Sequence, residues 1–222
     1  MAAVTQIRIA LDEERTVSGL LTGATDPFAS LVLAHGAGAG MRHAFMERLA
    51  DALAGRGVSL LRYQFPYMEA GLKRPDPPAI AQRAVRSAVA SAAGLPLFAG
   101  GKSFGARMTS QAQAAEALPG VRGLVFFGFP LHPAGAPAVS RAEHLSRVRV
   151  PMLFLQGSRD ALAEIGLVEG VVGRLGGLAT LHVVADADHS FHVPARSGRS
   201  DAEVMGEIAE RSASWMRATA AS

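Results

Sequence analysis

Residues 95–105, with the sequence LPLFAGGKSFG, decide the fold. The apolar run at their start is typical of a strand buried on both faces of a sheet, and a helical pattern follows at 107–117. Between the two, Gly101, Ser103 and Gly105 match the pattern GxSxG, in which a serine lies on a tight turn between a strand and a helix. Glycine is needed at both flanks because a side chain there would collide with the neighbouring strand or helix. The stretch predicts a serine raised above the sheet, where the helix dipole favours negative charge.

Outward from this stretch, short apolar runs alternate with helical patterns. The segments 5–11 and 16–22 predict an antiparallel hairpin. Buried strands are predicted at 30–34, 58–62, 95–99, 123–127, 152–155 and 181–184. Helices are predicted at 44–54, 79–93, 107–117, 161–175 and 202–216. The alternation predicts an α/β fold: a mostly parallel sheet with an antiparallel N-terminal hairpin, helices on both faces and no lid domain.

Three predicted loops, 64–78, 128–143 and 185–200, are longer than a plain connection needs, and each follows a strand. In open parallel sheets, ligands bind outside the carboxyl ends of the strands. We therefore expect these loops to gather around one site.

A nucleophilic serine needs a base, and the base needs an acid that orients it. Asp160 follows the predicted strand MLFL and a short turn, and His189 follows the predicted strand LHVV. Both residues therefore lie past the carboxyl ends of strands, as Ser103 does. The order Ser103, Asp160, His189 along the chain is the order found in α/β hydrolases. These residues are the predicted catalytic triad.

Other side chains near His189 offer alternatives. His192 competes as the base, but His189 comes first after the strand. Asp186 and Asp188 could act as the acid, or could hold a metal ion together with the two histidines. We favour Asp160 with His189, and expect no metal and no cofactor.

The second glycine cluster, HGAGAG at 35–40, suits the same chemistry. Its spacing excludes a dinucleotide loop, because Met41 stands where GxGxxG needs its last glycine. A Walker A loop ending at Ser103 is excluded too, because Pro96 stands in place of its first glycine. Acyl transfer needs two backbone N–H donors for the oxyanion, and we predict those of Phe104 and Ala37.

The pocket walls are predicted from the long loops. The candidates for substrate binding are the apolar and aromatic residues that follow strands, with one histidine: Phe65, Tyr67, Phe129, Leu131, His132 and Phe191. They favour a modest hydrophobic acyl group. Arg62, Lys73 and Arg74 would instead favour an acidic substrate if they face the same rim.

Composition limits the remaining possibilities. A length of 222 residues favours one domain, 1–222, and the absence of cysteine excludes disulfides, thiolate zinc sites and a cysteine nucleophile. The sequence pI is about 9.9, but the net charge is only +3 and the basic residues are scattered. We therefore expect no nucleic-acid partner.

The N-terminal stretch lacks the apolar core of a signal peptide and no long apolar window exists, so we expect no membrane contact and a cytoplasmic location. The oligomeric state stays open.

Four stretches together carry a family resemblance. They are GGKSFGAR at 100–107, GFPLHPAGAP at 128–137, VPMLFLQGSRD at 150–160 and DADHSFHVP at 186–194. Over essentially its full length the chain resembles the α/β-hydrolase superfamily. More narrowly, it is similar to a family of small dienelactone-hydrolase-like proteins that includes the third regulatory subunit of the animal NSL chromatin complex and a testis-expressed relative.

This resemblance implies a serine hydrolase with Ser103, Asp160 and His189 at the triad positions, and it implies no cofactor. The expected substrate is a small molecule with an ester, thioester or related acyl bond. Because some animal relatives serve as subunits of a complex, the alternative is a catalytically idle hydrolase fold used for binding or scaffolding.

Overall fold

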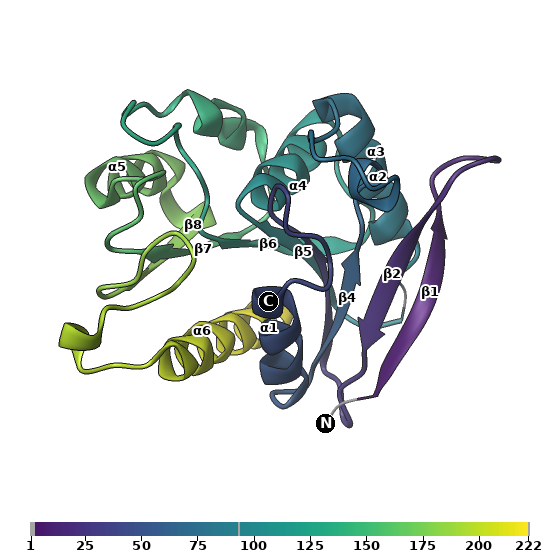
Figure 1. The fold of residues 1–222 in the computed structure, drawn as a ribbon, viewed down its shortest axis with the longest axis horizontal. Helices are drawn as coiled ribbons and strands as arrows, with labels where there is room; N and C mark the ends of the chain where they lie inside the picture. The colour runs from purple at the N-terminus through teal and green to yellow at the C-terminus, as the bar shows by residue number, and fades with distance from the viewer. Residues whose placement is uncertain (1–2, 93, 222) are drawn as a thin grey trace.

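The computed structural model describes residues 3–92 and 94–221. Their strands form one eight-stranded sheet in the order β1-β2-β4-β3-β5-β6-β7-β8 (Figure 1). The strands are β1 (Val4–Ala10), β2 (Thr16–Thr22), β3 (Ala29–Ala34), β4 (Val58–Tyr63), β5 (Leu97–Lys102), β6 (Val121–Phe127), β7 (Met152–Gly157) and β8 (Ala179–Val184). β2 pairs antiparallel with β1 and with β4, whereas the other pairs are parallel. The predicted parallel sheet with an antiparallel hairpin is confirmed.

Helices cover both faces of this sheet. They are α1 (Ala44–Ala54), α2 (Pro66–Glu69), α3 (Pro78–Ala90), α4 (Phe104–Ala115), α5 (Ile165–Leu175) and α6 (Asp201–Ala221), with short 3₁₀ turns η1 (Ser140–Arg147), η2 (Gly176–Leu178) and η3 (Ala195–Ser197). Figure 1 shows α1 and α6 on one face and α3, α4 and α5 on the other. α2 and the first half of η1 lie in segments predicted as loops. Within the described residues no segment adds a lid domain, as predicted, and no helix there is both long and apolar enough to span a membrane.

The predicted helices are present, α1 with the predicted bounds and the other four with shifted ends. α4 begins at Phe104, earlier than predicted, because Ser103 alone makes the turn from the strand. α5 begins at Ile165, later than predicted, because the residues before it form turns. α3 ends at Ala90, and position 93 of the predicted helix lies outside the described residues.

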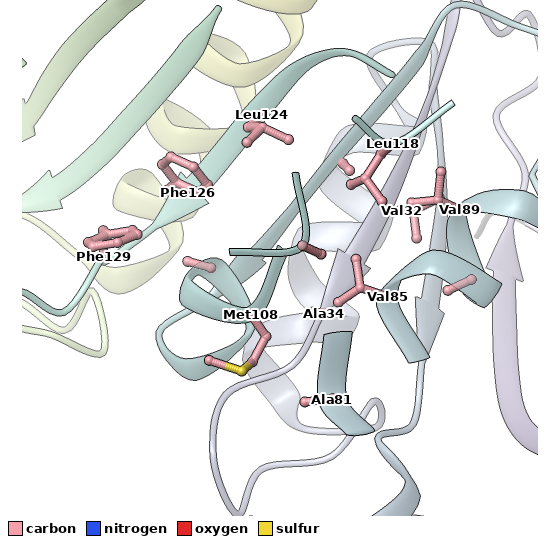
Figure 2. Close-up of a cluster of buried hydrophobic side chains, with 14 of the residues drawn as sticks. Val32, Ala34, Ala81, Val85, Val89, Met108, Leu118, Leu124, Phe126 and Phe129 are labelled. Atoms are coloured by element: carbon pink, nitrogen blue, oxygen red, sulfur yellow. The ribbon is translucent and has the colours of Figure 1, made fainter. Parts of the chain in front are cut away.

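The core consists of two layers, one on each face of the sheet. Along β3, Val32 and Ala34 face α3 and α4, while Leu31 and Leu33 face α1 and α6. This alternation is the period of two that a strand imposes on its side chains. Figure 2 shows the first layer, where side chains of α3 and α4 meet those of β3 and β6. Because this layer packs α4 against the sheet, it fixes the helix end that carries Ser103.

Candidate active site

Ser103 forms the turn between β5 and α4, with φ 54° and ψ −112°. A residue with a side chain keeps such a backbone conformation only where its surroundings hold it in place. A Cβ at Gly101 would lie 2.3 Å from the carbonyl carbon of Gly105, and a Cβ at Gly105 would lie 2.4 Å from the carbonyl oxygen of Ala34. The predicted collisions at both flanks are confirmed. They explain why this turn requires glycine on each side of the serine.

A chain of two hydrogen bonds links Ser103 to His189 and Asp160. The distance from Ser103 Oγ to His189 Nε2 is 2.8 Å, and that from His189 Nδ1 to Asp160 Oδ2 is 2.7 Å. Because an ionised carboxylate only accepts hydrogen bonds, Asp160 selects the tautomer that carries its proton on Nδ1. His189 Nε2 is then free to accept the serine proton. The structure brings together the three residues that were predicted as a triad.

The Asp160 carboxylate is fixed on both oxygens. Its Oδ2 also accepts a hydrogen bond from Gln156 Nε2 at 2.5 Å, and its Oδ1 accepts one from the Leu162 N–H at 2.8 Å. Asp160 is 3% exposed. A buried carboxylate with three donors keeps one orientation, and so holds the histidine ring in one orientation too.

The loop that carries His189 is held against the end of β7. A Cβ at Gly157 would lie 2.3 Å from the carbonyl oxygen of Ala187, so the two backbones touch here. Within the loop, Asp188 Oδ1 accepts hydrogen bonds from the N–H groups of Ser190 and His192, at 2.7 and 3.0 Å. These contacts position the loop that carries the imidazole.

The residues considered as an alternative base or as metal ligands have other partners in the structure. His192 Nδ1 lies 2.9 Å from Asp201 Oδ2, on the surface, and its hydrogen bond to Asp201 raises the pKa of His192. The Asp186 N–H donates to Ser158 Oγ. In residues 3–92 and 94–221 no three His, Cys, Asp or Glu side chains gather as a possible metal site.

The glycine loop after β3 presents Ala37 to the same site. His35, buried behind this loop, bridges the Gly36 carbonyl at 2.7 Å from Nδ1 and the Phe65 N–H at 3.1 Å from Nε2. Burial lowers the pKa of His35 to about 4, so the ring is neutral and Nδ1–H donates to Gly36. In a trans peptide the C=O and the N–H point in opposite directions. The bond to His35 therefore turns the Ala37 N–H away from the core.

Two more side chains from the β4 end hold this loop. Tyr67 Oη accepts a hydrogen bond from the Gly38 N–H at 2.9 Å, and Gln64 Oε1 accepts one from the Met41 N–H at 2.8 Å. The other predicted oxyanion donor, Phe104, is the first residue of α4. N–H groups of a first helical turn have no acceptor within their helix. Ala37 lines the same cavity as Ser103, and Phe104 follows Ser103 directly in the chain, so both predicted donor residues lie next to the serine.

A cavity of about 260 Å³ opens over Ser103. It is lined by Gly36, Ala37, Ala39, His43, Phe45, Met46, Lys102, Ser103, Leu162, His189 and Ser190. A larger cavity of about 490 Å³ lies between η1 and α5 and contains neither Ser103 nor His189. Size alone therefore does not locate the chemistry in this fold.

Comparison with known proteins gives the family. A family model for the alpha/beta hydrolase domain matches residues 27–217. The chain belongs to the alpha/beta hydrolase family. The fold of this alpha/beta hydrolase is also similar to several solved structures.

Three of these structures match almost end to end. The dienelactone hydrolase of Anabaena variabilis is 18% identical, with a TM-score of 0.77 over 97% of both chains. XC6422 of Xanthomonas campestris, described as a serine hydrolase without a lid, is 20% identical, with a TM-score of 0.73 over 96% of this chain and 94% of that one. The esterase domain of a Rhodothermus marinus protein is 16% identical, with a TM-score of 0.71 over 97% of this chain and 98% of that one. At such identities the matches show the lidless hydrolase fold.

In this alpha/beta hydrolase the residues predicted to bind substrate lie in the core. Among the described residues that line the cavity at Ser103, none is Phe65, Tyr67, Phe129, Leu131, His132 or Phe191. The loops after β4 and β6 turn back onto the sheet, because that buries their aromatic side chains. Phe191 contacts the wall of the cavity, since it stacks on the lining residue Phe45 with 5.7 Å between ring centroids.

The predicted basic rim is also placed differently. Arg62 is 3% exposed and donates to the Met41 carbonyl and Thr22 Oγ1. Lys73 and Arg74 are exposed and do not belong to the described lining of the cavity. None of the three belongs to the described lining of the cavity at Ser103.

Some residues of this alpha/beta hydrolase site were missed at the level of sequence. Lys102 directly precedes the serine. It lies four residues after Phe98 along β5 and therefore on the same face of the sheet, which is the face that α1 covers. Gln156 is the residue before the last of β7, and its side chain reaches Asp160. Extending the strand alternation of β5 into the serine motif would have shown which face carries Lys102. Gln156 was missed because β7 continues past the apolar run that predicted it, so the face of this residue was not assigned.

Proposed function

We propose that this chain is a serine hydrolase that cleaves an ester, thioester or related acyl bond of a small molecule. The observation that carries the proposal is the hydrogen-bonded chain from Ser103 through His189 to Asp160, at 2.8 and 2.7 Å. Few structural roles would require a strained serine, an imidazole and a buried carboxylate in this order.

The mechanism has two attacks on one carbonyl carbon. Ser103 Oγ forms a bond to that carbon while its proton moves to His189 Nε2, and the negative charge on the carbonyl oxygen is stabilised by the Phe104 and Ala37 N–H groups. The intermediate collapses, and His189 gives its proton to the leaving group. Water then attacks the acyl-enzyme in the same way, and Ser103 is restored.

The cavity limits the substrate. Its volume of about 260 Å³ lies below the usual range for ligand pockets, roughly 300–1,000 Å³, which favours a short acyl group.

The proposal needs no cofactor, metal or nucleic-acid partner, and treats 1–222 as one domain. It includes a cytoplasmic location, with which the absence of cysteine is compatible. It also assigns the chain to the small dienelactone-hydrolase-like group, because four stretches of the sequence resemble that group.

A fluorophosphonate probe tests this function directly. The probe phosphonylates an activated serine, so we expect the wild-type protein to be labelled and Ser103→Ala and His189→Ala to remain unlabelled. Ser110→Ala is the matched control, because Ser110 lies on the same helix but bonds to His144 and the Arg107 carbonyl. If wild type is labelled no better than Ser103→Ala, the chain is an idle fold that serves binding or scaffolding.

The loop that carries Ala37 offers a second measurement. We expect His35→Phe to lower kcat by about 10²-fold with little change in KM, because an oxyanion donor acts mainly in the transition state. Phenylalanine keeps the ring but loses the bond to the Gly36 carbonyl, so the peptide is no longer held.

The control is His144→Phe, which removes another histidine whose pKa burial lowers to about 4, away from the cavity. Steady-state kinetics on a short-chain ester give both constants. Equal losses of kcat in the two variants would refute a positioning role for His35.

A further inference from the structure

Lys102 brings an amine next to the reacting serine. It ends β5, directly before Ser103, and is 9% exposed. Its Nζ donates a hydrogen bond of 2.5 Å to the His189 carbonyl. The rings of Phe45 and Phe191 lie beside it, with their centroids 5.8 and 5.5 Å from Nζ. Lys102 thus combines a charge with an apolar surrounding, in which the charge interacts strongly.

This charge has no ionic partner among the residues that the structure describes. No carboxylate of residues 3–92 and 94–221 lies within 4.0 Å of Nζ. Asp160 and Asp188 are the acidic groups that act on Lys102 electrostatically. Asp160 already accepts three hydrogen bonds, and Asp188 already accepts two through Oδ1. A buried charge without a partner is costly, and proteins rarely keep one without a use for it.

We propose that Lys102 determines specificity at the Ser103 site by selecting acyl groups that carry a carboxylate. The inference rests on the function proposed above and names its substrate class. An ammonium has three N–H donors, and within the described chain the His189 carbonyl accepts one of them. The other two are available to a carboxylate, which would pair with the charge in a site that already holds the scissile carbonyl at Ser103.

The geometry also sets the length of the substrate. Lys102 and Ser103 are consecutive in sequence and line the same cavity of about 260 Å³. A carboxylate only a few carbon atoms from the scissile carbonyl fits this space. The substrate class is therefore the monoester or monothioester of a short dicarboxylic acid, with the free carboxylate on Lys102.

The state of Lys102 should follow pH. Burial lowers the pKa of Lys102 to about 8, while the charges of Asp160 and Asp188 oppose this shift. The amine is charged at neutral pH and becomes neutral as pH rises past about 8, so the preference for anionic substrates should fall there. His189 and His43 are the other titratable groups in the cavity lining, and His189 acts on the scissile carbonyl of both esters alike. The ratio of two kcat/KM values thus isolates Lys102.

The experiment compares ethyl hydrogen succinate with ethyl butyrate, two esters that differ by a carboxylate in place of a methyl group. Ethanol release gives kcat/KM for each. We expect wild type to prefer the succinate monoester by about tenfold or more, since a charge-assisted pair in an apolar site is worth at least that factor. We expect Lys102→Met to bring the ratio close to one and Lys102→Arg to retain a preference.

Lys73→Met is the matched control, because Lys73 is the other lysine of the chain and is exposed. We expect it to keep the wild-type ratio. The neutral fluorophosphonate probe is applied first: an unlabelled wild type refutes the serine hydrolase itself, whereas a labelled wild type without preference refutes only the role of Lys102. Equal losses on both esters in Lys102→Met would make Lys102 a support for the His189 loop and overturn the proposal. Should that variant fail to fold, a wild-type ratio that stays constant from pH 7 to pH 9 overturns it equally.

Discussion

Replacing Asp160 by asparagine is expected to lower kcat by about 10⁴-fold, because the histidine is then held in the wrong tautomer. In the wild-type protein Asp160 faces three donors: Gln156 and His189 at Oδ2, and the Leu162 N–H at Oδ1. An asparagine must place its NH₂ against one of these sides. In either orientation two donors meet, so we also expect a loss of about 1–3 kcal/mol in the free energy of unfolding.

The control for this variant is Asp186→Asn, which removes a carboxylate from the histidine loop without touching the ring. Asp186 has φ 59°, a conformation that asparagine adopts readily, so the loop should keep its course. Single-turnover kinetics with an activated ester measure the acylation step, and thermal unfolding measures stability. The proposed mechanism is wrong if Asp160→Asn acylates as fast as wild type, or if Asp186→Asn is the slower of the two.

Much of the fold could be predicted from the sequence, because buried parallel strands are short apolar runs that stand out between helical patterns. The three residues of the hydrogen-bonded chain could be predicted for a related reason. Ser103, Asp160 and His189 each follow such a run, and the carboxyl ends of parallel strands lie at one edge of the sheet. Chain order then limited the choice of acid and base.

The cavity lining could not be predicted by the same reasoning. Position after a strand places a backbone at the edge of the sheet, but does not say whether a side chain points toward solvent or back into the core. Phe65 and Phe129 turn inward, where they pack against His35 and Phe126. The actual lining comes partly from Phe45 and Met46 on α1, a helix on which no site residue was predicted. Lys102 was missed because it was treated only as the variable position before the serine of the GxSxG motif, and the direction of its side chain was not considered.

Substituting alanine for Gly100 is expected to have the largest effect on stability. Gly100 pairs with Val125 in the centre of the sheet, and an added Cβ would lie 2.0 Å from the Val125 carbonyl oxygen. The atoms in its way belong to the backbone of β6, so no rotation of a side chain can relieve the contact. Either β5 or β6 must shift, and the Ser103 N–H bond to the Phe127 carbonyl shifts with them. We expect a loss of more than about 4 kcal/mol, a large part of the total stability of a typical domain.

Gly206→Ala makes the same chemical change where the structure leaves room, since a Cβ on this α6 residue meets no other atom within 4 Å. In a helix interior alanine is favoured over glycine by about 0.5–1 kcal/mol, so this variant should be slightly more stable than wild type. Urea unfolding of both variants gives the comparison. Opposite signs for one added methyl group would show that backbone contact between β5 and β6 makes glycine necessary before the serine turn. A Gly100→Ala protein that unfolds at the wild-type urea concentration would contradict that contact.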